Sequence, residues 1–297
     1  MSDNSPEFQL GLIGHPVAHS RSPRLHEKML ELAGLRGSYR LIDLEVPELA
    51  EFFSRTAGEH NLSGVNVTIP HKVAVMSYIS ALDPLARATG AVNTIRFEED
   101  GTCTGYNTDI YGFGRSLGES YGGDGRGAFV YGYGGAARAV LISLIERGFK
   151  DIYLSGRDID KLKSFHREFA EELFRQRPCD TRLRLFQSGE VEADLLVNCA
   201  PVGQSKSSVG ADAVDFPDSL TVMMEALKGG GDKGFVFDLV YQTYRSSSTA
   251  VLEMAKGMGL NGIDGFDMLI YQAMKSFSLW TGCEVDASLL KRELAKK

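Results

Sequence analysis

The first third of the chain alternates between two patterns of hydrophobic residues. Short apolar runs predict buried strands, and segments with an apolar residue every three or four positions predict helices. Helical periodicity starts near Leu25 and again near Leu49, with apolar runs before, between and after these segments. The alternation predicts an α/β fold. The apolar runs are 10–13, 39–44, 65–69 and 91–95.

The second half of the chain has longer strand–helix–strand units, in which the hydrophobic periodicity is clearer. A helix is expected from Asp109 to about Leu117, and the glycine-rich segment 121–127 that follows indicates the approach to a second domain. Beyond it, strands alternate with helices, which implies parallel strands joined by crossover helices and a doubly wound sheet. No strand is expected after Leu239. The expected strands are 128–131, 152–155, 183–186, 195–199 and 235–239, and the expected helices are 137–147, 160–174, 268–280 and 287–295.

Composition narrows the class of protein. Of the 297 residues, 43% are hydrophobic and 24% charged, which is typical of a globular chain. The 32 Lys and Arg against 39 Asp and Glu give a net charge of -7, which disfavours a nucleic-acid surface and favours a small-molecule partner. The four cysteines form no C-x-x-C pair, so no metal site is expected. With neither an apolar run long enough to span a membrane nor a secretory signal, we expect a cytoplasmic protein without a membrane partner.

A glycine-rich loop follows the expected strand 128–131. Gly132, Gly134, Gly135 and Ala136 match the G-x-G-x-x-A pattern of dinucleotide-binding proteins, and a helix is expected directly after them. The first glycine permits a tight turn, and the second lets backbone amides approach a pyrophosphate at the helix N-terminus. A turn that is merely rich in glycine remains the alternative.

Two residues of opposite charge follow the next expected strand, about 20 residues after the glycine loop, where dinucleotide-binding folds contact the adenosine ribose. Arg157 suits the 2′-phosphate of NADP, whereas Asp158 suits the free 2′-hydroxyl of NAD. Asp158 is equally well placed to cap the helix that follows. The preference between NADP and NAD therefore stays open.

Polar residues also follow the expected strands of the first domain. Ser20 and Ser22 precede a helix, where two hydroxyls either cap the helix or bind a small carboxylate. Lys72 comes shortly after a strand end, where α/β proteins bind ligands, although most lysines are solvated surface residues. Asn93 and the segment 105–109 also place polar residues at strand ends. Residues that only form loops or cap helices would give the same pattern.

Six segments together resemble the ordered motif set of the shikimate/quinate dehydrogenase family. They occur in the family's order and extend over nearly the whole chain. They are 11–23 (GLIGHPVAHSRSP), 66–72 (NVTIPHK), 90–94 (GAVNT), 105–109 (GYNTD), 132–136 (GYGGA) and 264–272 (DGFDMLIYQ).

The resemblance implies a fold and a reaction. It implies an N-terminal α/β substrate-binding and catalytic domain at 1–108, a Rossmann-like dinucleotide-binding domain at 109–262, and C-terminal helices at 263–297 that pack back on the first domain, with a cleft between the domains. It implies reversible hydride transfer between NAD(P) and shikimate or 3-dehydroshikimate, with Lys72 and Asp109 as the catalytic pair. By the same resemblance, the substrate-binding residues are Ser20, Ser22, Thr68, Asn93, Tyr241 and Gln272, and the cofactor-binding residues are Gly132, Gly134, Gly135, Ala136, Arg157, Asp158 and Gly265.

The chain departs from the family pattern at three places. Gln204 replaces the usual methionine, Gly156 and Asp158 flank Arg157 where NADP-using members have Asn and Thr, and Tyr241 lacks the usual Asn-Pro after it. The changes around Arg157 favour NAD or dual cofactor use, and Gln204 and Gly156 leave a paralogue of broader specificity open. Oxidation of quinate is the other enzymatic alternative, and a non-catalytic metabolite sensor is the alternative from another class, because a fold does not establish an activity. The sequence leaves open whether the chain is a monomer or a homodimer.

Overall fold

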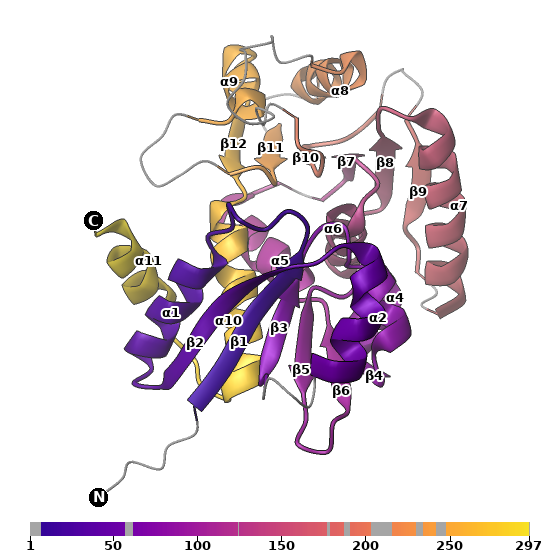
Figure 1. Ribbon diagram of the computed structural model, residues 1–297. Helices are drawn as coiled ribbons and strands as arrows, with labels where there is room; N and C mark the ends of the chain where they lie inside the picture. The colour runs from indigo at the N-terminus through magenta and orange to yellow at the C-terminus, as the bar shows by residue number, and fades with distance from the viewer. Residues whose placement is uncertain are drawn as a thin grey trace, which may run out of the picture. The chain divides into compact units, whose positions relative to one another are not determined.

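A computed structural model describes residues 7–56, 62–123, 125–176, 179–186, 191–202, 216–229, 234–241 and 248–296. The chain forms two compact units (Figure 1). The first contains Met1–Gly112 and Leu269–Lys297, and the second contains Phe113–Met268.

The described strands of the first unit form one mixed sheet of six, in the order β2-β1-β3-β5-β6-β4. β1 pairs in parallel with β2 and β3, whereas β5 is antiparallel to both of its neighbours, β3 and β6. The elements of the first unit are β1 (Glu7–Gly14), α1 (Ser22–Leu32), β2 (Arg36–Asp43), α2 (Leu49–Glu51), β3 (Gly64–Val67), β4 (Ala81–Leu82), α4 (Pro84–Thr89), β5 (Thr94–Phe97), β6 (Cys103–Tyr106) and α11 (Ala287–Ala295), with 3₁₀ turns at Val46–Glu48 and Ala74–Tyr78 and a π-helix at Phe52–Thr56. The boundaries between the units fall within two helices, α5 (Asp109–Ser120) and α10 (Phe266–Thr281).

The C-terminal helix α10 contacts the first sheet closely. The indole Nε1 of Trp280 donates a hydrogen bond of 2.9 Å to the backbone oxygen of Ile95 in β5. A Cβ on Gly64 in β3 would lie 2.1 Å from that same Nε1, so only glycine leaves room for the ring. Further along, Arg24 of α1 donates a hydrogen bond of 2.9 Å to the backbone oxygen of Leu294 in α11. The last two helices therefore complete the first unit.

The second unit is a parallel sheet, with the described strands in the order β12-β11-β10-β7-β8-β9. The order reverses at β7, which is the strand before the glycine loop, as expected for a doubly wound dinucleotide-binding fold. This confirms the predicted fold class. Its elements are β7 (Gly127–Tyr131), α6 (Gly135–Glu146), β8 (Asp151–Ser155), α7 (Ile159–Gln176), β9 (Arg182–Leu185), β10 (Leu195–Asn198), α8 (Asp218–Gly229), β11 (Phe235–Asp238), α9 (Ala250–Gly257) and β12 (Asn261–Asp264).

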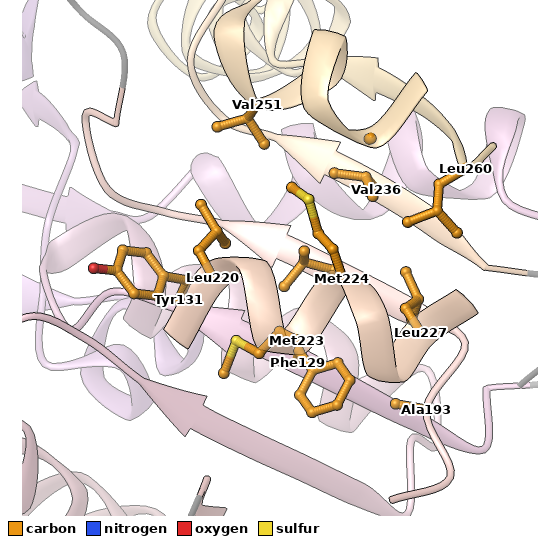
Figure 2. Close-up of a cluster of buried hydrophobic side chains, with 12 residues drawn as sticks. Phe129, Tyr131, Ala193, Leu220, Met223, Met224, Leu227, Val236, Val251 and Leu260 are labelled. Carbon is orange, nitrogen blue, oxygen red and sulfur yellow. The ribbon is translucent and has the colours of Figure 1, made fainter. Parts of the chain in front are cut away.

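Helix α8 packs its apolar face on this sheet. Met223 and Met224 are fully buried among side chains of β7 and β11, such as Phe129 and Val236 (Figure 2). Tyr131 lies at the end of the cluster with its hydroxyl directed away from the other labelled side chains. The packing fixes the end of β7, from which the glycine loop starts.

The expectation that no strand follows Leu239 is wrong. β12 pairs in parallel with β11 through the register Phe235 to Asn261 and Asp238 to Asp264. Its sequence, Asn-Gly-Ile-Asp, has no apolar run, because this edge strand is exposed or half-buried along its length. Hydrophobic patterning therefore gave no signal for it.

Candidate active site

Four strand ends of the first sheet lie at one edge. The carboxyl ends of β1, β3 and β6 are there because β1 is parallel to β3 and β6 runs the same way, one antiparallel strand apart. β5 runs in the opposite direction, so its first residue, Thr94, pairs with both Asn66 of β3 and Tyr106 of β6. The apolar run 91–95 was expected to be a strand, but only Thr94 and Ile95 of it are strand residues. Asn93 consequently sits just outside the strand, at this edge.

The loops at this edge bring Lys72, Asn93 and Asp109 together. Lys72 Nζ donates a hydrogen bond of 2.6 Å to Asp109 Oδ2, and Asn93 Nδ2 donates one of 2.8 Å to Asp109 Oδ1. The side chains of Lys72 and Asp109 are only 17% and 9% exposed, so the ion pair is largely shielded from water. Both carboxylate oxygens of Asp109 are thereby occupied, which fixes the orientation of the carboxylate and the position of the amine.

A buried layer of hydroxyl and amide groups supports this triad. Thr108 donates its backbone N–H to Asn93 Oδ1 over 2.7 Å, which orients the Asn93 amide. Ser276 Oγ of α10 lies 2.8 Å from Thr94 Oγ1 and 3.0 Å from Thr108 Oγ1, and accepts from Asn66 Nδ2 at 3.0 Å. The sequence reasoning missed Ser276. Its position four residues after Gln272, and hence on the same helix face, is the signal that was available.

Gln272 reaches the triad from the helix α10. Its Oε1 accepts from Asn93 Nδ2 at 3.4 Å and from Thr108 Oγ1 at 3.5 Å, while its Nε2 donates to the backbone oxygen of Leu269 at 2.9 Å. The side chain is half-buried. The structure therefore brings Lys72, Asn93, Asp109 and Gln272 into one hydrogen-bonded cluster.

The two serines lie in the loop after β1 and at the start of α1. Ser20 Oγ donates to Ser22 Oγ at 3.1 Å and accepts from the Ser22 backbone N–H at 3.2 Å. The N-cap residue of α1 is Arg21, which makes no side-chain cap hydrogen bond. Thr68 lies against the end of β1, because a Cβ on Gly14 would be 2.4 Å from its methyl carbon. Ser20, Ser22 and Thr68 are all half-buried, so their hydroxyls remain reachable at the edge that carries the triad.

His15 and Asp43 form a second charged pair, after β1 and at the end of β2. His15 Nδ1 lies 2.6 Å from Asp43 Oδ1, and both side chains are about half exposed. Hydrogen bonding to Asp43 raises the pKa of His15 above its ordinary value, and the same bond lowers the pKa of Asp43. The sequence reasoning did not single out this pair.

The glycine loop of the second unit has the geometry that an anionic group requires. Gly132 has φ of 119°, a value that side chains other than glycine rarely adopt. A Cβ on it would also lie 3.2 Å from the backbone carbon of Cys199. Gly134 is the N-cap of α6 and no side chain caps the helix, so the amides of Gly135 and Ala136 in its first turn are left for a ligand. The loop residues present therefore fit a dinucleotide pyrophosphate.

The carboxylate of Asp158 is held by the backbone that follows it. Its Oδ1 accepts hydrogen bonds from the backbone N–H groups of Lys161 at 3.0 Å and Asp160 at 3.2 Å. These bonds, the one from Lys161 foremost, lower the pKa of Asp158. Asp158 is thus the cap of α7, while Arg157 beside it is exposed. Of the two readings of Asp158 from sequence, the structure supports the cap.

Asp238, at the carboxyl end of β11, is a buried acid that the sequence reasoning did not select. Its Oδ1 accepts from Asn198 Nδ2 at 2.7 Å and from the backbone N–H of Val240 at 3.1 Å. Burial raises its pKa to about 6. The hydrogen bonds tie the ends of β10 and β11 together.

The remaining predicted residues lie in the second unit. Tyr241 is half-buried and follows Val240 directly. Gly265 packs against the backbone of Leu239, because a Cβ on it would lie 2.2 Å from the Leu239 oxygen. Gln204 lies outside the described residues.

Within the described parts of the chain, no three His, Cys, Asp or Glu side chains gather where they could hold a metal ion. No described helix is both long enough and apolar enough to cross a membrane.

Comparison with known proteins gives consistent matches. Residues 12–95 match the family model described as the shikimate dehydrogenase substrate binding domain, and residues 265–294 match that of the shikimate 5′-dehydrogenase C-terminal domain. A shikimate dehydrogenase (NADP(+)) of Methanopyrus kandleri is 38% identical over 291 residues, which cover 95% of this chain and 93% of that protein.

Solved structures agree with these matches. The crystal structure of Thermus thermophilus shikimate 5-dehydrogenase in complex with NADP(H) and shikimate is 33% identical, with a TM-score of 0.77, and the match covers 97% of this chain and 98% of that one. The structure of the Listeria monocytogenes enzyme in complex with shikimate and NAD is 27% identical, with a TM-score of 0.78, and the match covers 99% of each chain.

Proposed function

Because the chain belongs to the shikimate dehydrogenase family, we propose that it catalyses the reversible oxidation of shikimate to 3-dehydroshikimate with NADP as the preferred cofactor. The observation that carries the proposal is the shielded triad of Lys72, Asp109 and Asn93. Oxidation of a secondary alcohol needs a base that removes the hydroxyl proton as hydride leaves the carbon, and reduction needs the same group as an acid. The nicotinamide supplies the hydride chemistry when it is bound.

Lys72 is the proton acceptor in this proposal. In the oxidation direction, the neutral amine takes the hydroxyl proton and becomes an ammonium group. Asp109, 2.6 Å away, stabilises that positive charge and fixes the position of Nζ. Asn93 holds the second oxygen of Asp109, so the carboxylate cannot rotate away from the amine. In the reduction direction, the ammonium group returns the proton to the forming alkoxide.

The substrate has a carboxylate and hydroxyl groups that need hydrogen-bond donors. We assign the carboxylate to Ser20 and Ser22, whose linked hydroxyls bind an anion without bringing a competing cation. The ring hydroxyls are assigned to Thr68, Asn93, Asp109, Gln272 and Tyr241. The first domain and the C-terminal helices would bind the substrate, and the domain that contains the glycine loop would bind the cofactor.

The preference for NADP follows from the surroundings of Asp158. The Oδ1 of Asp158 accepts two backbone hydrogen bonds of the helix it caps, and its Oδ2 lies 3.4 Å from Lys161 Nζ, so both oxygens already have partners with which a ribose 2′-hydroxyl would compete. Arg157, by contrast, is exposed at the end of β8 and can pair with a 2′-phosphate. The relatives whose names include NADP(+) support the same choice.

One assay tests the proposal. Purified protein is given shikimate or quinate with NADP or NAD, and the absorbance of the reduced nicotinamide is followed at about 340 nm, which depends on the cofactor's own chemistry. The proposal predicts the highest kcat/KM for shikimate with NADP. Preference for quinate would mean that the pocket at Ser20 and Ser22 accepts the additional hydroxyl of that substrate. Absence of turnover in all four combinations would contradict the proposal and favour a metabolite sensor.

A further inference from the structure

The side chains of Asn198 and Asp238 join the carboxyl ends of two strands in the second unit. These strands, β10 and β11, lie side by side in the parallel sheet (Figure 1), and their last residues, Asn198 and Asp238, are paired in its register. Both residues are fully buried. Asn198 Nδ2 donates a hydrogen bond of 2.7 Å to Asp238 Oδ1.

Each of these side chains also holds the loop that follows its own strand. Asn198 Nδ2 donates to the backbone oxygen of Ala200 over 2.9 Å, and Asn198 Oδ1 accepts from the Ala200 N–H at 3.1 Å. Asp238 Oδ1 accepts from the backbone N–H of Val240 at 3.1 Å. The bond between Asn198 and Asp238, which we call the clasp, therefore couples the first residues of the two loops.

The clasp lies at the strand ends of one half of the sheet. The order β9-β8-β7-β10-β11-β12 is that of doubly wound folds in which one half receives the adenosine and the other half receives the second nucleotide. The adenosine half consists of β7, β8 and β9, and the clasp belongs to the other half. The loop after β10 also starts against the glycine loop, because a Cβ on Gly132 would lie 3.2 Å from the backbone carbon of Cys199 and 3.4 Å from the backbone nitrogen of Ala200.

Stability alone does not account for a carboxyl group at this position. Asp238 Oδ2 is buried and has no hydrogen-bond partner among the described residues. Burial raises the pKa of Asp238 to about 6, so the fold disfavours the charged form of this side chain. A charged oxygen accepts stronger hydrogen bonds than an amide oxygen does, and Oδ1 accepts the two bonds that hold Asn198 and Val240. The carboxylate thus makes the two loops more rigid at a cost in stability.

We propose that Asn198 and Asp238 are positioning residues, which hold the loops after β10 and β11 in the conformation that receives the nicotinamide nucleotide of the cofactor. The inference rests on the proposed use of a nicotinamide dinucleotide. Loops that are already ordered need not be ordered by the ligand, so an intact clasp increases the affinity for this nucleotide. Loss of the clasp weakens binding of the complete dinucleotide and leaves binding of its adenosine half unchanged.

Two ligands separate the halves of the cofactor site in the full chain. NADP contains both nucleotides, whereas adenosine 2′,5′-bisphosphate contains only the adenosine half, and titration calorimetry at pH 8 gives the affinity for each. Asp238→Leu removes the acceptor and should lower the affinity for NADP by about tenfold or more, with the affinity for the bisphosphate within about twofold of the wild-type value. Asp238→Asn keeps an acceptor and should lower the affinity for NADP by no more than about threefold.

Two further substitutions complete the test. Asn198→Ala should also lower the ratio of the NADP affinity to the bisphosphate affinity, and it decides the test if thermal unfolding shows that Asp238→Leu is not folded. The double variant should lose less than the product of the two single effects, because the two residues share a hydrogen bond. Thr181→Val is the matched control: Thr181 Oγ1 donates a buried hydrogen bond of 2.8 Å to the backbone oxygen of Phe149, and both residues precede strands at the amino edge of the same sheet. This control should lose stability without a change in the ratio.

Several outcomes would overturn the inference. The first is an unchanged NADP affinity in the folded variants. An equal loss of affinity for NADP and the bisphosphate would show a general structural effect, and effects that multiply in the double variant would show that the two residues act separately. If the wild-type protein binds NAD instead, NAD and adenosine 5′-monophosphate replace the two ligands. A protein that binds neither dinucleotide contradicts the proposed cofactor as well, whereas turnover of shikimate together with an unchanged ratio contradicts the clasp alone.

Discussion

Replacement of Lys72 by arginine and by methionine separates the two roles proposed for this residue. Arginine keeps the positive charge beside Asp109 but cannot take up a proton, because its pKa exceeds about 12. Methionine removes both the charge and the base. If proton transfer is the role of Lys72, both variants should lose about 10²–10⁴ in kcat, the usual contribution of a positioned acid or base. The KM for shikimate should change much less, because the carboxylate is assigned to Ser20 and Ser22.

The stability of the two variants should differ even though their turnover falls together. Lys72→Met leaves the Asp109 carboxylate largely shielded from water, with only Asn93 donating to it among the contacts described above. Breaking a fully buried pair in this way costs about 3–5 kcal/mol, and the 17% and 9% exposure of the two side chains reduces the expected loss to about 2–3 kcal/mol. Lys72→Arg should lose less, since it can retain the ion pair.

Steady-state kinetics and urea unfolding of the three proteins measure both effects. A Lys72→Arg variant with more than about a tenth of the wild-type kcat would refute proton transfer by this residue, because an arginine cannot perform it. A Lys72→Met variant as stable as the wild-type protein would refute the argument that the pair is shielded. The same substitution at Lys163, an exposed lysine of α7, provides a control for the loss of a lysine charge.

Four further substitutions test other parts of the structure. Burial raises the pKa of Asp238 to about 6, so the stability that its protonated form contributes is lost as pH rises through about 6. Asp238→Asn should therefore raise the unfolding free energy at pH 8 by about 1–3 kcal/mol relative to the wild-type protein. This difference should vanish near pH 4, where Asp238 is protonated in the folded protein. Ser276→Ala removes a hydroxyl shared by three buried polar side chains and should cost about 1–3 kcal/mol of unfolding free energy in urea titrations. Gly64→Ala should cost at least about 1–3 kcal/mol in the same titrations, because its Cβ would lie 2.1 Å from Trp280 Nε1. Asp158→Ala should lose about 1 kcal/mol by removing the cap of α7, while Asp158→Ser should restore it; equal stability of the two would contradict the assigned cap.

Hydrophobic patterning predicted those elements that bury a continuous apolar surface. The strands 128–131 and 195–199 were predicted to within a residue of β7 and β10, because both are buried along their whole length. β12 was missed because an edge strand needs no apolar run. The segment 91–95 was expected to be a strand because it is an apolar run; Ala91 and Val92 are buried, but neither is a strand residue. Hydrophobic patterning therefore predicts which residues are buried. It fails for a strand that is paired but exposed, and for a buried segment that pairs with no strand.

The sequence motifs predict which residues belong to the candidate site, but not how those residues contact one another. The sequence gives no indication that β5 is antiparallel, yet that orientation is what places Asn93 at the same edge as Lys72 and Asp109. Ser276 could be expected to share a helix face with Gln272, but not to contact Thr94, since that contact depends on how α10 lies on the sheet. Tertiary packing, rather than local propensity, determines these partners.

The two charges after β8 show how local hydrogen bonding determines which residue remains available for a ligand. From sequence alone, Arg157 favours NADP and Asp158 favours NAD, and the departures from the family pattern on either side of Arg157 favour NAD or dual use. The backbone amides at the start of α7 bind Oδ1 of Asp158, and Lys161 Nζ lies 3.4 Å from its Oδ2. A ribose hydroxyl would have to compete with these amides, whereas the exposed guanidinium of Arg157 gains its best partner only when a phosphate arrives. The proposed preference for NADP therefore depends on Arg157, because Gly156 and Asp158 stand where NADP-using members of the family have two further phosphate-binding residues.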